Sequence, residues 1–78
     1  MIDPDPPAEF TPQVRSAKAV LYILLHGRAL TWEIARLTGL SWDGAYRMMC
    51  ALSVDPELGL YQDDHAWVLL NPRKFVKL

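Results

Sequence analysis

The stretch "LTWEIARLTGLSWDGAYRMM", residues 30–49, contains two short helical segments joined at a glycine. Thr31 is a residue type that caps helices and Gly39 suits the left-handed backbone that ends one, so the first helix is predicted from Thr31 to Gly39. Ser41 is a second good N-cap, and Pro56 disfavours helix in the residue before it, so the next helix is predicted between these two. Together they indicate a helix-turn-helix.

The second of these helices is expected to have two distinct faces. Four apolar residues recur at helical spacing and form the expected buried face: Ala45, Met48, Met49 and Leu52. The opposite side is expected to carry polar residues, with two aromatic side chains at its margins: Asp43, Arg47 and Cys50, then Trp42 and Tyr46. The aromatic pair has two interpretations, contact with a ligand or ordinary packing.

A third helix is predicted upstream, from about Pro12 to His26. Thr11 is its expected N-cap, Pro12 suits the first helical position, and Gly27 suits the stop. Apolar residues cover nearly all sides of its last two turns: Val14, Ala17, Leu21 and Leu24 at helical spacing, then Val20, Ile23 and Leu25. Such a helix needs more cover than a small domain supplies, from the N-terminal arm, the C-terminal tail or a second subunit. A symmetric dimer is the simplest of these options.

The remaining chain divides into an arm, a hairpin and a tail. Residues 1–10 are acidic and proline-rich and are expected to form a flexible arm. The segment "LYQDDHAWVLL", 60–70, predicts an antiparallel hairpin with its turn at Asp63, Asp64 and His65. The domain is therefore expected over residues 11–70, followed by a basic tail over 71–78. The fold class is mainly α with a small β-hairpin.

Composition limits the classes of function. With 78 residues and a formal net charge of -1, the chain has room for one domain and carries no strong overall charge. Its single cysteine, Cys50, cannot form an internal disulfide, and with His26 and His65 it makes no zinc-binding pattern. The longest apolar run, 19–25, is too short to span a membrane. A cytoplasmic protein with no cofactor, no metal and no membrane partner is expected.

Three helices followed by a hairpin resemble the winged helix-turn-helix family over roughly residues 13–70. The resemblance is carried by the following residues: Glu33, Ile34 and Ala35, then Thr38, Gly39, Leu40 and Ser41, then Ala45, Met48 and Leu52, and "GLY" at 59–61. The stretch with Tyr46 after "TGLS" is also similar to PadR-type repressors. Independently, Ala35 is small where two helices cross, and Leu40 is placed to fill the space between them.

The resemblance implies a small transcriptional regulator that binds double-stranded DNA. It places the third helix in a major groove, with a reading surface of Ser41, Trp42, Asp43, Tyr46 and Arg47. Arg47 suits the O6 and N7 edge of guanine, and Asp43 suits cytosine N4 or the positive end of its own helix. Arg28 and Arg36 are expected to contribute positive charge near this helix.

Charge argues for a second hypothesis. Over residues 10–78 there are eight basic and six acidic residues, a small surplus for a DNA-binding domain. The hairpin turn carries Asp63 and Asp64, which would repel phosphates. The alternative is therefore a protein-interaction module, in which Trp42, Tyr46 and the acidic turn bind a basic protein. No nucleophile with a suitably spaced base and no phosphate-binding loop is present, so an enzyme is not expected.

Overall fold

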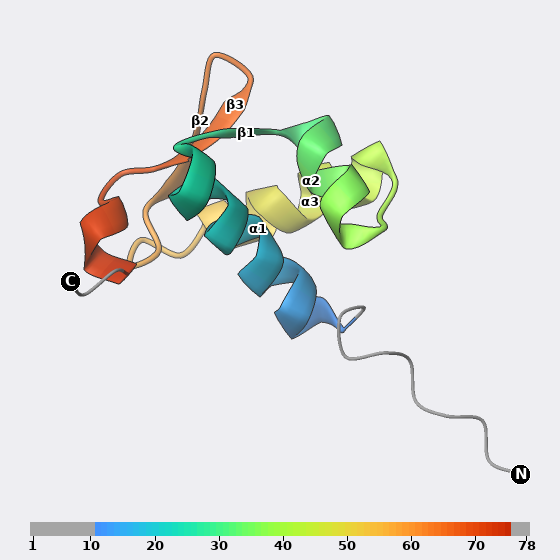
Figure 1. Cartoon of the computed structure of the whole chain (residues 1–78), viewed down its shortest axis with the longest axis horizontal. Helices are drawn as coiled ribbons and strands as arrows, with labels where there is room; N and C mark the ends of the chain where they lie inside the picture. The colour runs from blue at the N-terminus through green and yellow to red at the C-terminus, as the bar shows by residue number, and fades with distance from the viewer. Residues whose placement is uncertain (1–10, 76–78) are drawn as a thin grey trace, which may run out of the picture.

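The computed structural model describes residues 11–75, so the arm predicted at 1–10 and the last residues of the tail lie outside the described chain. Three helices precede an antiparallel hairpin, and the arrangement is that of a small winged helix (Figure 1). The elements are α1 (Pro12–His26), β1 (Ala29–Leu30), α2 (Thr31–Thr38), α3 (Trp42–Ser53), β2 (Leu60–Asp63), β3 (Ala66–Leu69) and the 3-10 helix η2 (Pro72–Phe75). The predicted fold class is confirmed.

Helix α1 has the predicted bounds and both predicted caps. The Val14 amide donates to the Thr11 hydroxyl at 3.3 Å, and Pro12 occupies the first turn, where a missing amide proton costs nothing. Gly27 ends the helix with φ 84°, and its amide donates to the Ile23 carbonyl at 2.7 Å. Local sequence therefore determines this helix at both ends.

Only one side of α1 is buried by the rest of the domain. Ala19 and Ile23 are buried in the core, whereas Leu21 and Leu25 remain 55% and 72% exposed. The buried pair lies outside the repeat of Val14, Ala17, Leu21 and Leu24 noted in the sequence. An apolar repeat shows that a helix has an apolar face, but neighbouring elements decide which face is covered.

The turn between α2 and α3 forms as predicted. Gly39 adopts φ 73°, and the Leu40 amide donates to the Ala35 carbonyl at 3.1 Å. The Ser41 hydroxyl then accepts from the Gly44 amide at 3.1 Å and caps α3. Glycine is required at the turn because a Cβ is disfavoured in left-handed backbone.

The prediction that Thr31 caps α2 is wrong. Leu30 is the N-cap residue, and the Glu33 carboxylate accepts its amide at 2.8 Å. Thr31 is instead buried, and its hydroxyl accepts from Nε1 of Trp67 at 2.9 Å. The Thr31 hydroxyl, which the sequence suggests as a helix cap, therefore binds Trp67 of the hairpin instead.

The sheet has one more strand than the sequence predicts. Strand β3 lies between β1 and β2, with Ala29 opposite Trp67 and Leu60 opposite Leu69. The predicted hairpin, with strands at 60–62 and 67–70, is confirmed: β2 is one residue longer at its end, and β3 begins and ends one residue earlier. Strand β1 is only two residues long, so it carries no alternating pattern from which it could have been predicted.

The core lies where α1, α2, α3 and β3 meet. Its buried side chains include Ile23, Ile34, Met49 and Trp67, and Ala45 of α3 is also fully buried. Met48 and Leu52 are partly buried against it, so the predicted face of α3 does point inward. In the tail, η2 folds back toward the loop after α3, where Nζ of Lys74 donates to the Glu57 carbonyl at 2.6 Å. Within residues 11–75, no helix is long and apolar enough to cross a membrane.

Candidate nucleic-acid interface

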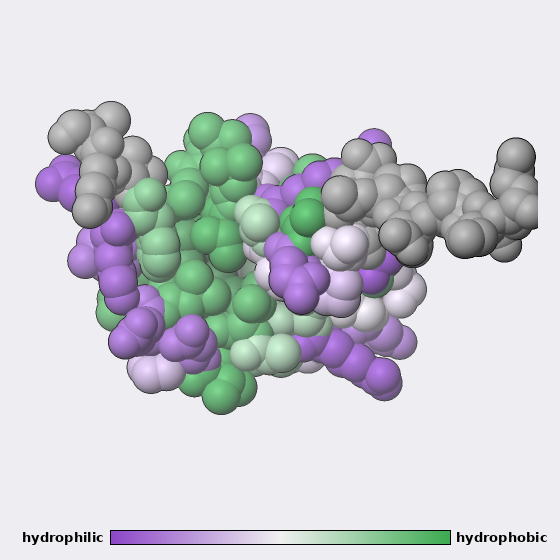
Figure 2. Space-filling model, turned by 90° about the horizontal axis from the view of Figure 1, so that it is seen from below, coloured by the Kyte–Doolittle hydropathy of each residue, from purple (hydrophilic) through white to green (hydrophobic). Residues whose placement is uncertain are grey.

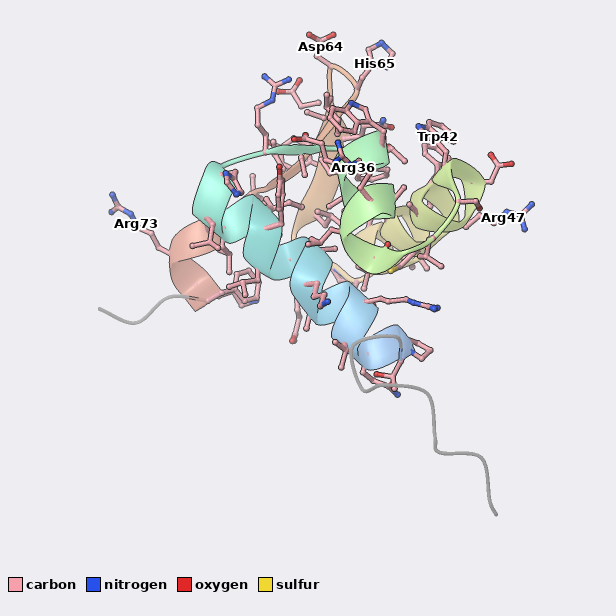
Figure 3. All side chains as sticks on the ribbon, turned by 45° about the vertical axis from the view of Figure 1, so that its right-hand side comes forward. Arg36, Trp42, Arg47, Asp64, His65 and Arg73 are labelled. Atoms are coloured by element: carbon pink, nitrogen blue, oxygen red, sulfur yellow. The ribbon has the colours of Figure 1, made fainter. Side chains whose placement is uncertain are left out.

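The N-terminal half of α3 presents one side to solvent. Ser41, Trp42, Asp43 and Arg47 are exposed, whereas Ala45 and Met49 on the opposite side are fully buried. Figure 3 shows Trp42 and Arg47 extending from the same end of α3, with Arg47 directed away from the body of the domain. The helical repeat thus separates a packing face from an outward face, as the sequence predicts.

Trp42 is held in place by a short chain of aromatic rings. Its ring stacks on that of Tyr46, with centroids 5.2 Å apart and planes 7° apart. Tyr46 in turn meets Trp67 edge to face, with centroids 5.9 Å apart. Trp67 is buried, but Trp42 is 53% exposed. Tyr46 therefore packs between core and surface, and Trp42 is a supported ring with an accessible side.

A hollow lies between the start of α3, the start of α2 and the hairpin. Side chains from all three elements line this surface, hereafter the α3 hollow: Leu30, Thr31, Trp32, Trp42, Tyr46, Gln62 and His65. It therefore combines aromatic rings with an amide and an imidazole, groups that contact nucleobases by stacking and hydrogen bonding.

Five of these seven lining residues were not predicted as site residues, and three of the five carry polar or aromatic groups that suit a binding surface on α2 and the hairpin. Trp32, Gln62 and His65 come together with Trp42 only through packing of α2 and the hairpin against α3. The sequence could have identified Gln62, because side chains along a strand such as β2 alternate between the two faces of the sheet. For Trp32, 49% exposed on α2, no local pattern indicates the contact.

The acidic residues of the hairpin turn lie on the other side of the hairpin. Asp63 and Asp64 line a separate hollow with His26, Gly27 and Arg28. Arg28 is therefore beside the acidic turn rather than beside α3. Figure 3 shows Asp64 and His65 at the tip, well away from Arg47. The structure thus brings together the five predicted α3 residues but does not bring Arg28 to them.

Arg36 of α2 contacts Trp32, one of the residues that line the α3 hollow. Its guanidinium carbon lies 5.8 Å from the ring centroid of Trp32, within the range of a cation–π contact. Arg36 itself lines a different hollow, with Tyr22, Trp32, Glu33 and Leu37, to which no residue of α3 contributes. Its expected place near α3 therefore stays a prediction.

Cys50 does not point outward as the sequence suggests. It is partly buried against the core, beside Tyr46 one helical turn earlier. A hydrogen bond with the Cys50 side chain, then the negative charge of Cys50 in its thiolate form and burial, raise the pKa of Tyr46. The Tyr46 ring packs inward against Trp67 of β3, so this side of α3 faces the hairpin.

Nothing in the described chain assembles a metal site. Within residues 11–75, no group of three or more histidine, cysteine, aspartate or glutamate side chains lies close enough to hold a metal ion. His65 lines the α3 hollow, and the two aspartates before it line the hollow beside Arg28.

The chain matches no protein-family model, and comparisons with curated proteins and with solved structures give no significant match. What this surface does must therefore be inferred from its own residues.

Proposed function

We propose that the protein is a winged helix-turn-helix regulator that binds double-stranded DNA in the cytoplasm as a dimer, with α3 as its recognition helix. The observation that carries the proposal is the exposed stripe of Ser41, Trp42, Asp43 and Arg47 on a helix whose opposite face is buried. A major groove admits a helix of this width, and side chains near its N-terminus then reach base edges.

Each side chain has a role that its chemistry allows. The Arg47 guanidinium donates two hydrogen bonds to O6 and N7 of a guanine. Trp42 supplies an apolar contact to a thymine methyl group, and Arg36 contacts a phosphate. Asp43 lies in the first turn of α3, where it also complements the positive end of the helix dipole.

The acidic turn opposes DNA binding less than the sequence implies. Asp63 and Asp64 share their hollow with Arg28, while Gln62 and His65 face the α3 side. A hairpin that approaches DNA with the α3 side therefore presents an amide and an imidazole. The formal net charge of -1 still predicts modest affinity, which falls as salt rises because phosphate contacts release counterions.

Fluorescence anisotropy tests the proposal directly. The protein is titrated into a labelled random duplex pool at several salt concentrations, and a bound sequence is selected from that pool. We expect binding that weakens steeply as salt rises, because phosphate contacts release counterions. Absence of binding at the lowest salt would reject DNA binding by this domain.

Arg47→Ala tests whether Arg47 recognises a particular base or only adds electrostatic attraction to the DNA. We expect a loss of about 1–3 kcal/mol on the selected site and relaxed preference at one base position. Arg73→Ala is the matched control, since it removes the same charge from η2 at the opposite end of the molecule (Figure 3). Equal affinity of Arg47→Ala and the parent for the selected site would remove Arg47 from the reading surface.

A second candidate function is protein recognition through the α3 hollow. It is favoured by two half-exposed tryptophans, Trp32 and Trp42, on the wall of one hollow. Tryptophan is enriched among residues that dominate protein interfaces. A pull-down in the presence of nuclease, with the parent and Trp42→Ala side by side, tests it. A stoichiometric protein that is retained by the parent and lost with Trp42→Ala supports this function.

A further inference from the structure

The α3 hollow differs in chemistry from other exposed apolar surface of the molecule. Figure 2 shows hydrophobic residues gathered in a band across the underside. Leu21, Leu25 and Leu37 line an almost entirely apolar hollow between α1 and α2. The α3 hollow instead combines the rings of Trp32 and Trp42 with an amide and an imidazole. It therefore suits a flat ligand whose faces are apolar and whose edges carry hydrogen-bonding groups.

The polar groups of the α3 hollow are not engaged by the described chain. Within residues 11–75, the side chains of Gln62 and His65 make no hydrogen bond to another residue, and neither do the indole nitrogens of Trp32 and Trp42. The Gln62 amide donates and accepts at once, which is the pattern that pairs with the edge of a base. These groups are therefore open to a ligand in the hollow.

The aromatic surface is set in place by the fold. Trp42 stacks on Tyr46 at 5.2 Å between centroids, and Tyr46 meets the buried ring of Trp67. Trp32 and Trp42 nevertheless remain 49% and 53% exposed. A ring that is already held in one orientation loses little conformational entropy when a flat group stacks on it.

Shape indicates which form of DNA reaches these rings. The α3 hollow has a volume of about 470 Å³, within the range of about 300–1,000 Å³ for pockets that hold small organic groups. Bases in a paired duplex present only their edges in the grooves, because their faces are stacked on one another. A recessed surface with aromatic rings is therefore complementary to a base that has left the stack.

We infer that the α3 hollow binds one unpaired nucleobase of DNA beside the duplex that α3 contacts. The base stacks on Trp42, contacts Trp32 and forms hydrogen bonds with Gln62 at its edge. This inference rests on the proposed function and narrows its ligand to duplexes that contain an unpaired base. Such a base costs less to unstack than a paired one, and stacking on an aromatic side chain adds affinity that depends little on sequence.

Anisotropy with two DNA pools tests the inference. The labelled random duplex pool is compared with a bulged pool, which is identical except for an unpaired thymine at its centre. We expect the parent to bind the bulged pool about tenfold tighter. Equal affinity for the two pools would overturn the inference and leave the proposed DNA binding intact, whereas binding of neither pool would overturn both.

Variants outside the proposed reading surface locate the base. Trp32→Ala and Gln62→Ala are expected to remove most of the preference for the bulged pool, and to change affinity for the paired pool by less than about twofold. Tyr61→Ala is the matched control, because Tyr61 is an exposed aromatic residue next to Gln62 on β2 and does not line the α3 hollow. A preference that survives both Trp32→Ala and Gln62→Ala would overturn the inference.

Photocrosslinking identifies the contact directly. Iodouracil replaces the unpaired thymine of the bulged pool, and irradiation joins it to an aromatic side chain that it touches. Mass spectrometry is expected to locate the crosslink at Trp32 or Trp42. A crosslink confined to residues outside the α3 hollow would contradict the assignment, even where the bulged pool is preferred.

Discussion

A buried side-chain hydrogen bond joins the hairpin to the start of α2. Nε1 of Trp67 donates to the Thr31 hydroxyl at 2.9 Å, and the two residues are 2% and 3% exposed. The same indole ring supports Tyr46, which supports Trp42 at the surface. The position of one candidate DNA-contacting side chain therefore depends on a polar pair inside the core.

Trp67→Phe is expected to lower the free energy of unfolding by about 1–3 kcal/mol, because it leaves the buried Thr31 hydroxyl without its donor. Urea denaturation measures the loss. Trp42→Phe, at a half-exposed position, is the control and should change stability by less than about 0.5 kcal/mol. Combining Trp67→Phe with Thr31→Val should cost less than the sum of the two single changes, and strict additivity would contradict the coupling.

Glu33 gives the start of α2 a dependence on pH. The Leu30 amide first, then the Tyr22 hydroxyl and the charges of His26 and Arg28, hold the pKa of Glu33 below its usual value, while burial opposes them. Because the folded-state pKa is the lower one, this carboxylate stabilises the fold above its unfolded pKa. That contribution is lost as pH falls through the folded pKa.

Tyr22→Phe removes one of these causes and so raises the folded pKa of Glu33, and the acid-induced loss of stability is expected to be smaller and to be complete at a higher pH than in the parent. Unfolding free energies measured between about pH 6 and pH 2 will show the shift. Glu33→Gln should reduce the pH dependence, whereas Glu57→Gln, at an exposed position, should leave it nearly unchanged. An unchanged profile for both Tyr22→Phe and Glu33→Gln would contradict the assigned role of Glu33.

At the scale of elements, the hairpin turn contains the least favourable backbone. Asp64 and His65 adopt φ values of 49° and 68° between paired strands. Two positive φ values in a two-residue connection are typical of a type I′ turn, where glycine or asparagine is preferred. Both positions carry a side chain despite this cost, and His65 lines the α3 hollow.

His65→Gly is expected to stabilise the fold by roughly 0.5–1 kcal/mol, because glycine adopts positive φ without a Cβ penalty. Thermal unfolding measures the gain. His65→Ala removes the same imidazole but keeps the Cβ, so it should give no gain. If the two variants are equally stable, backbone conformation is not what limits this turn.

At the scale of the described molecule, the two acidic residues of the hairpin turn lie on the opposite side of the hairpin from the α3 hollow. Arg36 and Arg47 lie on the side of α2 and α3, and Asp63 and Asp64 lie beside Arg28 on the other. Net charge alone describes neither side, since a nearly neutral protein can present local fields of either sign. The proposed DNA contact depends on this separation.

Asp63→Asn/Asp64→Asn is expected to raise affinity for duplex DNA by about twofold to tenfold at low salt, and less at high salt, because screening weakens the repulsion. Anisotropy against the selected duplex measures the change. Asp55→Asn/Glu57→Gln changes the net charge equally in the loop beside η2, away from the hairpin. Equal gains from both double variants would assign the effect to net charge instead of position.

The sequence alone determined the elements whose ends depend on neighbouring residues. The caps at Thr11 and Ser41 and the glycines at 27 and 39 each act on backbone only a few residues away. For this reason α1, the helix-turn-helix and the hairpin could be predicted. The outward stripe of α3 also follows from its period, since apolar spacing on one side leaves polar residues on the other.

Only the tertiary structure decided which surfaces face one another. It paired Thr31 with Trp67 instead of using Thr31 as a cap, and it added β1 to the sheet. It placed Arg28 by the acidic turn and brought Trp32 and His65 to Trp42. It also buried Ala19 and Ile23 while leaving Leu21 and Leu25 outside. These contacts join residues far apart in the chain, and no local spacing encodes which of several apolar or polar faces a neighbouring element will cover.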